Sequence, residues 1–189
     1  SEQYYQKPNK NKKIVLANKI SGMNNSKGIY LLENLQSIGF SEDLVTVNNI
    51  NFVNPISKDS YKKYMFVLED AFTTEENDSI FTISFAPYKN TSFNSLKGTI
   101  TINSDNWAIQ NIKAEPNKHE LFSIDIQQLY EKTDGVWFPK QLNTNIKIVL
   151  EGAVDASTDG ILCGIGKSYI SEIEINKEID KNIFDMSDY

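Results

Sequence analysis

The spacing of apolar and polar residues changes once along the chain, and each part predicts a different element. In residues 26–38 the apolar side chains recur at the spacing of one helical face, and Gly39 follows them directly. A serine at the start and a glycine after the end are typical helix boundaries, so this segment predicts a helix. After Gly39 apolar and polar residues alternate over most of the chain, which is typical of strands with one buried face.

The alternating part divides into segments that we predict to be strands, separated by turns rich in asparagine, aspartate and glycine. These segments are residues 44–47, 50–53, 63–68, 81–85, 96–103, 107–114, 122–126, 142–150 and 167–176. No helical segment lies between them, which excludes the crossover connections of a parallel sheet. The sequence therefore predicts a mainly β (α+β) fold, with a single curved antiparallel sheet, half-barrel-like, packed on one or more helices.

One of these segments contains a change of phase. Trp107 and Ile109 fall out of step with Ile112 and Ala114, so we expect a bulge near Gln110. A β-bulge bends its strand and increases the twist of the sheet. The change of phase is one reason to expect a curved sheet.

The beginning of the chain has no periodicity. Residues 1–13 mix Tyr, Gln, Asn, Lys and one Pro, and we interpret them as a linker or arm. Residues 14–189 are then a single β-rich domain. The chain starts at Ser1 without an initiator methionine or a signal peptide, and we expect it to be excised from a larger protein.

The amino-acid composition and net charge limit the kinds of molecule that the chain could bind. The 189 residues carry a net charge of −6, and all 19 basic residues are lysine. Proteins that bind the phosphates or guanine bases of nucleic acids usually do so with arginine guanidinium groups and a basic surface. This chain has neither, so nucleic acid is excluded as a partner. One cysteine cannot form an internal disulfide, and no apolar run approaches the roughly 20 residues of a membrane helix.

The residues that could carry chemistry are few. His119 is the only histidine and lies in a polar turn, without a nucleophile motif or further zinc ligands. Residues 155–160 imitate the opening of a calcium loop, but Gly166 stands where the closing glutamate belongs. The acidic residues 69–78 are typical of a hairpin loop that keeps a sheet edge soluble. We therefore expect no catalytic residue, no metal and no cofactor.

Apolar side chains on the central strands are the candidate ligand-binding residues, because a curved sheet can hold an apolar ligand on its concave face. For any one aromatic ring, packing in the core is the simpler explanation, and that alternative stays open. The candidates are Phe81, Ile83, Phe85, Ile100, Ile102, Trp107 and Trp137.

Several short motifs, weak singly, follow one another in a specific order. They are residues 17–22 with the helix after them, 52–57, 64–70, 96–103, 128–130 with 137–139, and 166–170. Together they resemble a family of large Gram-negative outer-membrane proteins of unknown function, described by its fused carboxypeptidase-like regulatory domain. The resemblance covers roughly residues 14 to 185.

The resemblance implies a parent protein with a signal peptide, a small β-sandwich, a middle region like this chain and a carboxy-terminal β-barrel. The middle region is also similar to the half-barrel of LolA/LolB-type lipoprotein carriers. This implies a non-enzymatic periplasmic domain, attached to the outer membrane through its parent, with a binding or assembly role. Its expected partners are a lipid or other apolar ligand and the other domains of the parent. Two alternatives are a structural spacer between sandwich and barrel and, less favoured, a cryptic hydrolase.

Overall fold

The computed structural model describes residues 2–6, 10–14, 39–47, 50–118, 122–149 and 161–185. The chain forms two compact units. The smaller unit combines Ser1–Ile29 with Glu172–Tyr189, and the larger unit is Tyr30–Ser171. The proposed division between an arm and a domain at residue 14 stays a prediction.

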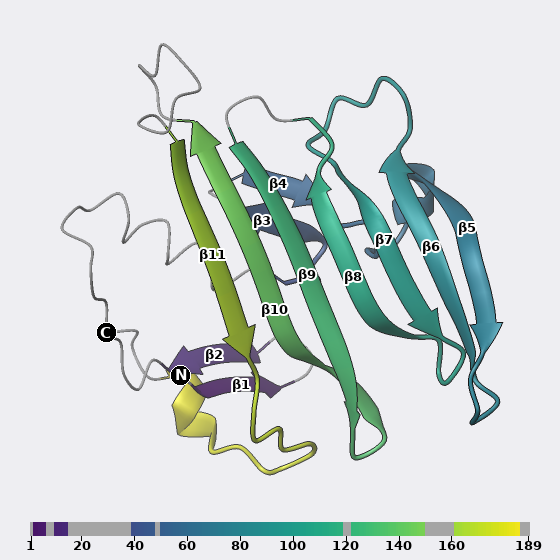
Figure 1. The fold of residues 1–189 in the computed structure, drawn as a ribbon. Coiled ribbons are helices and arrows are strands. Elements are labelled where there is room, and N and C mark those ends of the chain that lie inside the picture. The colour runs from purple at the N-terminus through teal and green to yellow at the C-terminus, as the bar shows by residue number, and fades with distance from the viewer. Residues whose placement is uncertain are drawn as a thin grey trace. The chain divides into compact units, whose positions relative to one another are not determined.

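The larger unit is built on a seven-stranded antiparallel sheet, which we call the main sheet (Figure 1). Each strand pairs with the strand that follows it in the sequence, so the chain meanders from one edge of the sheet to the other. This confirms the predicted antiparallel meander. The strands are β5 (Tyr64–Thr73), β6 (Ser79–Pro87), β7 (Leu96–Asn103), β8 (Ala108–Pro116), β9 (Phe122–Thr133), β10 (Val136–Val149) and β11 (Ile161–Tyr169).

The predicted half-barrel is not what forms. The main sheet is neither closed nor strongly curled, and the described residues contain no α-helix that packs on it. Curling a sheet into a barrel requires a consistent tilt and stagger in all of its strands, whereas a bulge bends a strand locally. The helix predicted for residues 26–38 lies outside the described residues.

The predicted bulge is confirmed. Thr101 pairs with Asn111, whereas the next residue of β7, Ile102, pairs with Ile109, so Gln110 is the extra residue. Two further register shifts occur, at Glu69 in β5 and at Lys140 in β10. The residues around these two shifts gave no change of phase in the sequence.

The predicted strands do not all join a single sheet: a second, two-stranded sheet lies on one face of the main sheet. It consists of β3 (Leu44–Val47) and β4 (Ile50–Val53), two of the predicted strands, which pair as a hairpin with Val47 opposite Ile50. Val53 forms a parallel bridge with Ser95, and its amide donates to the Asn94 carbonyl at 3.0 Å. These bonds fix the hairpin beside the start of β7.

One buried tyrosine joins the hairpin to the main sheet. The Tyr64 hydroxyl donates to the Val53 carbonyl at 2.6 Å and accepts from the Leu96 amide at 3.2 Å. Burial raises the pKa of this hydroxyl, so it remains a donor at neutral pH. The short 3₁₀-helix η1 (Ser60–Lys62) precedes this residue.

The core lies between the hairpin and the main sheet, and we call the face of the sheet that carries it the inner face. Apolar side chains of both layers form one cluster, with a buried asparagine beside it. The Asn54 amide nitrogen donates to the carbonyls of Phe40 and Glu42 at 3.0 and 2.7 Å, which holds residues 39–43 in place. The cluster contains Phe40, Val45, Val47, Phe52, Tyr64, Phe85, Leu96, Ile100, Ile112, Ala114, Ile124, Ile126, Leu142 and Ile146.

The last strand differs from the prediction. β11 begins at Ile161 and ends at Tyr169, whereas the alternation predicted a strand over residues 167–176. Glycines lower strand propensity, so the pattern around Gly164 and Gly166 did not predict a strand. Both glycines nevertheless pair with β10, because the ladder needs only their backbone groups.

The smaller unit contains a two-stranded antiparallel sheet where the sequence predicted no element. It is formed by β1 (Glu2–Gln6) and β2 (Lys10–Ile14), and the 3₁₀-helix η3 (Lys181–Asp185) belongs to the same unit. Strand pairing uses backbone groups that any residue except proline supplies, so a polar hairpin can form without alternating side chains.

Candidate functional site

The seven apolar residues predicted to bind a ligand all lie on the inner face. On the paired strands β6 and β7, Phe81 lies opposite Ile102 and Ile83 lies opposite Ile100. Phe85 follows two residues later on β6 and belongs to the core cluster. Directly paired residues share a face in an antiparallel sheet, so these five side chains form one apolar surface.

The two tryptophans join this surface from outside the central strands. Trp107 lies in the turn between β7 and β8, and its ring stacks on Phe81 with centroids 5.8 Å apart and an interplanar angle of 16°. Trp137 lies near the start of β10, opposite Lys132, and its indole nitrogen donates to Asp105 at 3.3 Å. The fold thus gathers aromatic rings from β6, β10 and a hairpin turn.

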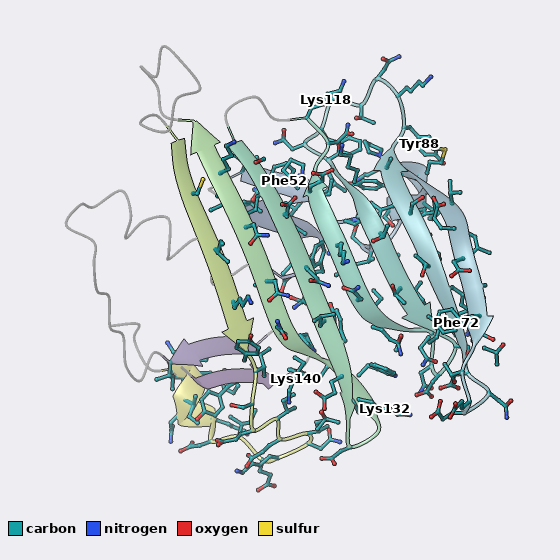
Figure 2. The ribbon with its side chains drawn as sticks, viewed as in Figure 1. Phe52, Phe72, Tyr88, Lys118, Lys132 and Lys140 are labelled. Atoms are coloured by element: carbon teal, nitrogen blue, oxygen red, sulfur yellow. The ribbon has the colours of Figure 1, made fainter. Side chains whose placement is uncertain are left out.

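The inner face has two ends that differ in how deeply the side chains are buried. Figure 2 shows Phe52 of the β3–β4 hairpin and Tyr88 towards one end of the larger unit, with Phe72 and Lys132 towards the other. At the hairpin end Phe85 and Ile100 are buried, each with 3% exposure. We call this part the closed end.

We call the rest of the apolar surface the open end, and it is formed by Phe81, Ile83, Ile102, Trp107 and Trp137. Its side chains are half-buried or exposed, and Trp107 is 70% exposed. Of the seven predicted residues, two therefore fill the core and five form a surface. The sequence could not separate them, because both groups have the same alternation.

A carboxylate ties the two hairpin turns of the open end together. Asp105, in the turn between β7 and β8, forms an ion pair with Lys132 and accepts the indole hydrogen of Trp137. The hydrogen bond from Lys132, followed by that from Trp137, lowers the pKa of the Asp105 carboxyl. Sequence reasoning missed this pair, since an aspartate in a Ser-Asp-Asn turn has the pattern of an ordinary turn residue.

Polar groups also border the open end on β9. Tyr130 packs against the core, and its hydroxyl donates to Gln128 at 3.1 Å. Burial raises the pKa of Tyr130 to about 12, so this phenol stays protonated under physiological conditions. The open end therefore combines aromatic and aliphatic surface with a hydroxyl and one ion pair.

None of the other candidates adds chemistry to this surface within the described residues. His119 and residues 155–160 fall outside the described residues. Cys163 is exposed on β11, and the acidic residues 69–78 follow the edge strand β5 into its turn. Within the described ranges, no three side chains of the metal-ligating types come together. The described part of the chain also has no helix of a length and hydropathy that could span a membrane.

Comparison with known proteins gives a family and nothing closer. The sequence matches a family of unknown function, DUF5686, over residues 1–158. No curated protein and no solved structure matches the chain.

Proposed function

Since the chain belongs to the DUF5686 family, whose function is unknown, we propose that it is a non-enzymatic binding module. In this proposal the open end of the inner face holds an acyl chain or another apolar ligand. The resemblance to outer-membrane proteins supports a periplasmic location, with the domain attached to the membrane through a longer parent.

The exposure of Trp107 is the observation that carries the proposal. A tryptophan ring that is 70% exposed leaves a large apolar area in water, although it stacks on Phe81. Covering such area with an apolar ligand gains about 25 cal/mol per Å². Exposed apolar surface that is continuous with a core is typical of a binding site.

The backbone at Trp107 supports the same role. Asn106 and Trp107 both have positive φ, at 56° and 54°. This left-handed region suits asparagine and glycine in a tight hairpin, whereas a bulky residue is uncommon there. A tryptophan at this position costs backbone energy that glycine would save, which favours a use for its ring.

The surroundings favour an amphipathic ligand. The rings of Phe81 and Trp107 offer an apolar platform, while the ion pair of Asp105 and Lys132 lies at its border. An acyl chain can cover the platform while its polar group remains near these charges and the surrounding water. Fatty acids and lysolipids are therefore the ligands to test first.

The test uses tryptophan fluorescence of the whole chain during titration with a fatty acid or a lysolipid below its micelle concentration. We expect a saturable shift, which Phe81→Ala weakens by removing the ring beneath Trp107. The control is Tyr88→Ala, because Tyr88 is an exposed aromatic residue towards the other end of the larger unit. Circular dichroism of each variant shows first that it folds.

Two results would overturn the proposal. One is the absence of any saturable shift with acyl ligands, which would leave the domain as a structural spacer. The other is an equal loss of the shift in Phe81→Ala and Tyr88→Ala, which would mean non-specific adsorption. Native mass spectrometry of protein from its own membrane then identifies any lipid that co-purifies.

A further inference from the structure

Strands β8, β9 and β10 lie side by side in the main sheet (Figure 1), and they carry side-chain amides on the face opposite the core. We call this face the outer face. Successive residues of a strand point to opposite faces, so the neighbours of the buried Ile112, Ile126 and Leu142 lie there. Four of these neighbours, which we call the amide ladder, are Asn111, Gln127, Gln141 and Asn143.

The amide ladder is a continuous chain of hydrogen bonds that run in one direction. Gln141 Nε2 donates to Asn143 Oδ1 at 2.7 Å, and Asn143 Nδ2 donates to Gln127 Oε1 at 3.2 Å. Gln127 Nε2 then donates to Asn111 Oδ1 at 3.3 Å. Each bond holds the next amide in place, so the ladder is ordered before a ligand arrives. An ordered surface loses less side-chain entropy when it binds.

The two inner amides of the ladder keep half of their hydrogen-bonding capacity. A primary amide has two N–H donors and an oxygen with two lone pairs. Gln127 and Asn143 each use one donor and one lone pair in the ladder, and neither bonds to any other described residue. Both residues are half-buried, so a ligand can reach the groups that remain. Each of these amides therefore offers one donor and one acceptor side by side.

A lysine extends the row of Gln127 and Asn143 at each end. Lys113 on β8 pairs with Gln127, and Lys167 on β11 pairs with Asn143. Three strand spacings separate the two lysines, which is about 14 Å. Both lysines are exposed, and neither forms an ion pair within the described ranges. The row therefore combines uncharged amides in its middle with a positive charge at each end.

The balance of charge on the outer face of β7 to β11 favours an anionic ligand. Glu115 and Glu131 are each neutralised by a lysine, at 3.2 and 3.5 Å. The charged side chains there that form no ion pair with a described residue are Lys113, Lys147, Lys167 and Asp125. Three lysines against one aspartate contrast with the whole chain, whose net charge is −6.

An exposed aromatic ring lies beside the ladder. Tyr169 on β11 pairs with Gln141 and is 66% exposed. Lys167 precedes it by two residues on the same strand, so both side chains point to the outer face. A tyrosine offers a flat apolar ring with a polar tip, which suits the apolar face and the hydroxyls of a sugar.

We propose that the outer face binds an acidic polysaccharide, which lies across the strands along the row Lys113, Gln127, Asn143 and Lys167. Sugar hydroxyls both donate and accept, so they match the paired donor and acceptor that each inner amide keeps. Carboxylates of the polysaccharide meet the two lysines, and a sugar ring stacks on Tyr169. An acidic peptide is a poorer match, because its carboxylates only accept hydrogen bonds.

The first test is isothermal titration calorimetry of the whole chain with three probes of similar length. Hexagalacturonate carries hydroxyls and carboxylates, maltohexaose carries hydroxyls alone, and hexaglutamate carries carboxylates without hydroxyls. We expect saturable binding of hexagalacturonate with a Kd on the order of 100 µM. Maltohexaose and hexaglutamate should each bind about tenfold more weakly or less, because each lacks one of the two kinds of contact.

The second test breaks the ladder. Gln127→Leu removes the amide in the middle of the row and should weaken hexagalacturonate binding by about fivefold or more. Ser123→Leu is the matched control, because Ser123 is exposed on the same strand and the same face but lies outside the ladder. Tyr169→Ala should also weaken binding, whereas Tyr169→Phe should preserve it, since stacking needs only the ring. Circular dichroism of each variant shows first that it folds.

The third test uses the two lysines. Lys113→Gln and Lys167→Gln should each weaken hexagalacturonate binding by about threefold or more at low salt, and the difference should shrink as salt screens the charges. Lys89→Gln changes the net charge equally in the turn after β6, and should leave binding unchanged. Binding of the uncharged maltohexaose should be the same in all three variants.

Three results would overturn the inference. They are the absence of saturable binding of hexagalacturonate, equal losses in Gln127→Leu and Ser123→Leu, and binding of hexaglutamate as tight as that of hexagalacturonate. The last result would assign the face to an acidic peptide or to general electrostatic attraction. The site shares no residue with the open end, so its failure leaves the proposal of an apolar ligand there untouched.

Discussion

The closed and open ends of the inner face have similar side chains and different environments. At the closed end Phe85 and Ile100 form part of a core that the β3–β4 hairpin completes. At the open end Phe81 and Ile102 lie on the same two strands, yet they remain half-buried. The difference shows that the position of the second layer, rather than residue type, separates structural from candidate binding residues.

The largest expected effect comes from shortening one phenylalanine at each end. Phe85→Ala should lower the free energy of unfolding by about 3–5 kcal/mol, because it leaves a cavity in a packed core. Phe81→Ala should cost only about 1–2 kcal/mol, mainly through the lost stacking with Trp107. Urea denaturation followed by circular dichroism measures both, and equal losses would show that the two ends are equally packed.

The next largest effect concerns the hydrogen bonds that attach the β3–β4 hairpin, which covers the closed end, to the main sheet. Tyr64→Phe removes the hydroxyl that bonds to Val53 and Leu96, and should cost about 2–3 kcal/mol because two buried backbone groups lose their partner. Tyr88→Phe is the control, since its hydroxyl is exposed and makes only a 3.4 Å contact. A change near zero in Tyr64→Phe would mean that the hairpin is held by apolar contacts alone.

The smallest expected effect is the pH dependence of the ion pair between Asp105 and Lys132 at the open end. The pKa of Asp105 is lowered in the folded chain, mainly by Lys132, so the ionised carboxylate stabilises the fold above its ordinary pKa. This stabilisation disappears as the pH falls through the lowered folded-state pKa. Asp105→Asn should therefore melt at a lower temperature than the unchanged chain at pH 7, with the difference vanishing in strong acid.

A second variant checks the cause of that pH dependence. Lys132→Gln removes the main partner of Asp105, so adding Asp105→Asn to it should change the melting temperature less than it does in the unchanged chain. Thermal unfolding by circular dichroism at several pH values gives all four curves. A difference that persists in acid would assign the effect to the turn itself rather than to the ion pair.

Much of the larger unit could be predicted from local pattern. The alternation of residues 81–85 and 96–103 predicted β6 and β7, and the change of phase after Ile109 predicted the extra residue Gln110. These features depend on neighbours along the chain, where a period of two is a direct signal. The strand with Gly164 and Gly166 was not predicted, because glycine has no side chain that could mark a buried face and lowers strand propensity.

The sequence predicted which residues belong to the candidate site, but not which other side chains lie beside them. Alternation correctly set Phe81, Ile83 and Phe85 on one face, and the structure adds the neighbours that sequence reasoning missed, Asp105 and Lys132. Their ion pair joins residues 27 positions apart, one in the turn between β7 and β8 and the other at the end of β9. No spacing rule predicts such a contact, since it depends on how two hairpins end beside each other.

Periodicity and turn residues are enough to predict an antiparallel meander, because both act locally and leave little choice of topology. Packing between distant segments, and not local pattern, leaves the main sheet open and sets the β3–β4 hairpin over one end of its inner face. It also leaves strand β5, with its apolar residues 65–68, at an edge of the sheet. Coverage and edge position depend on contacts between segments far apart in the chain, and an alternating pattern is the same whether its apolar side meets another layer or water.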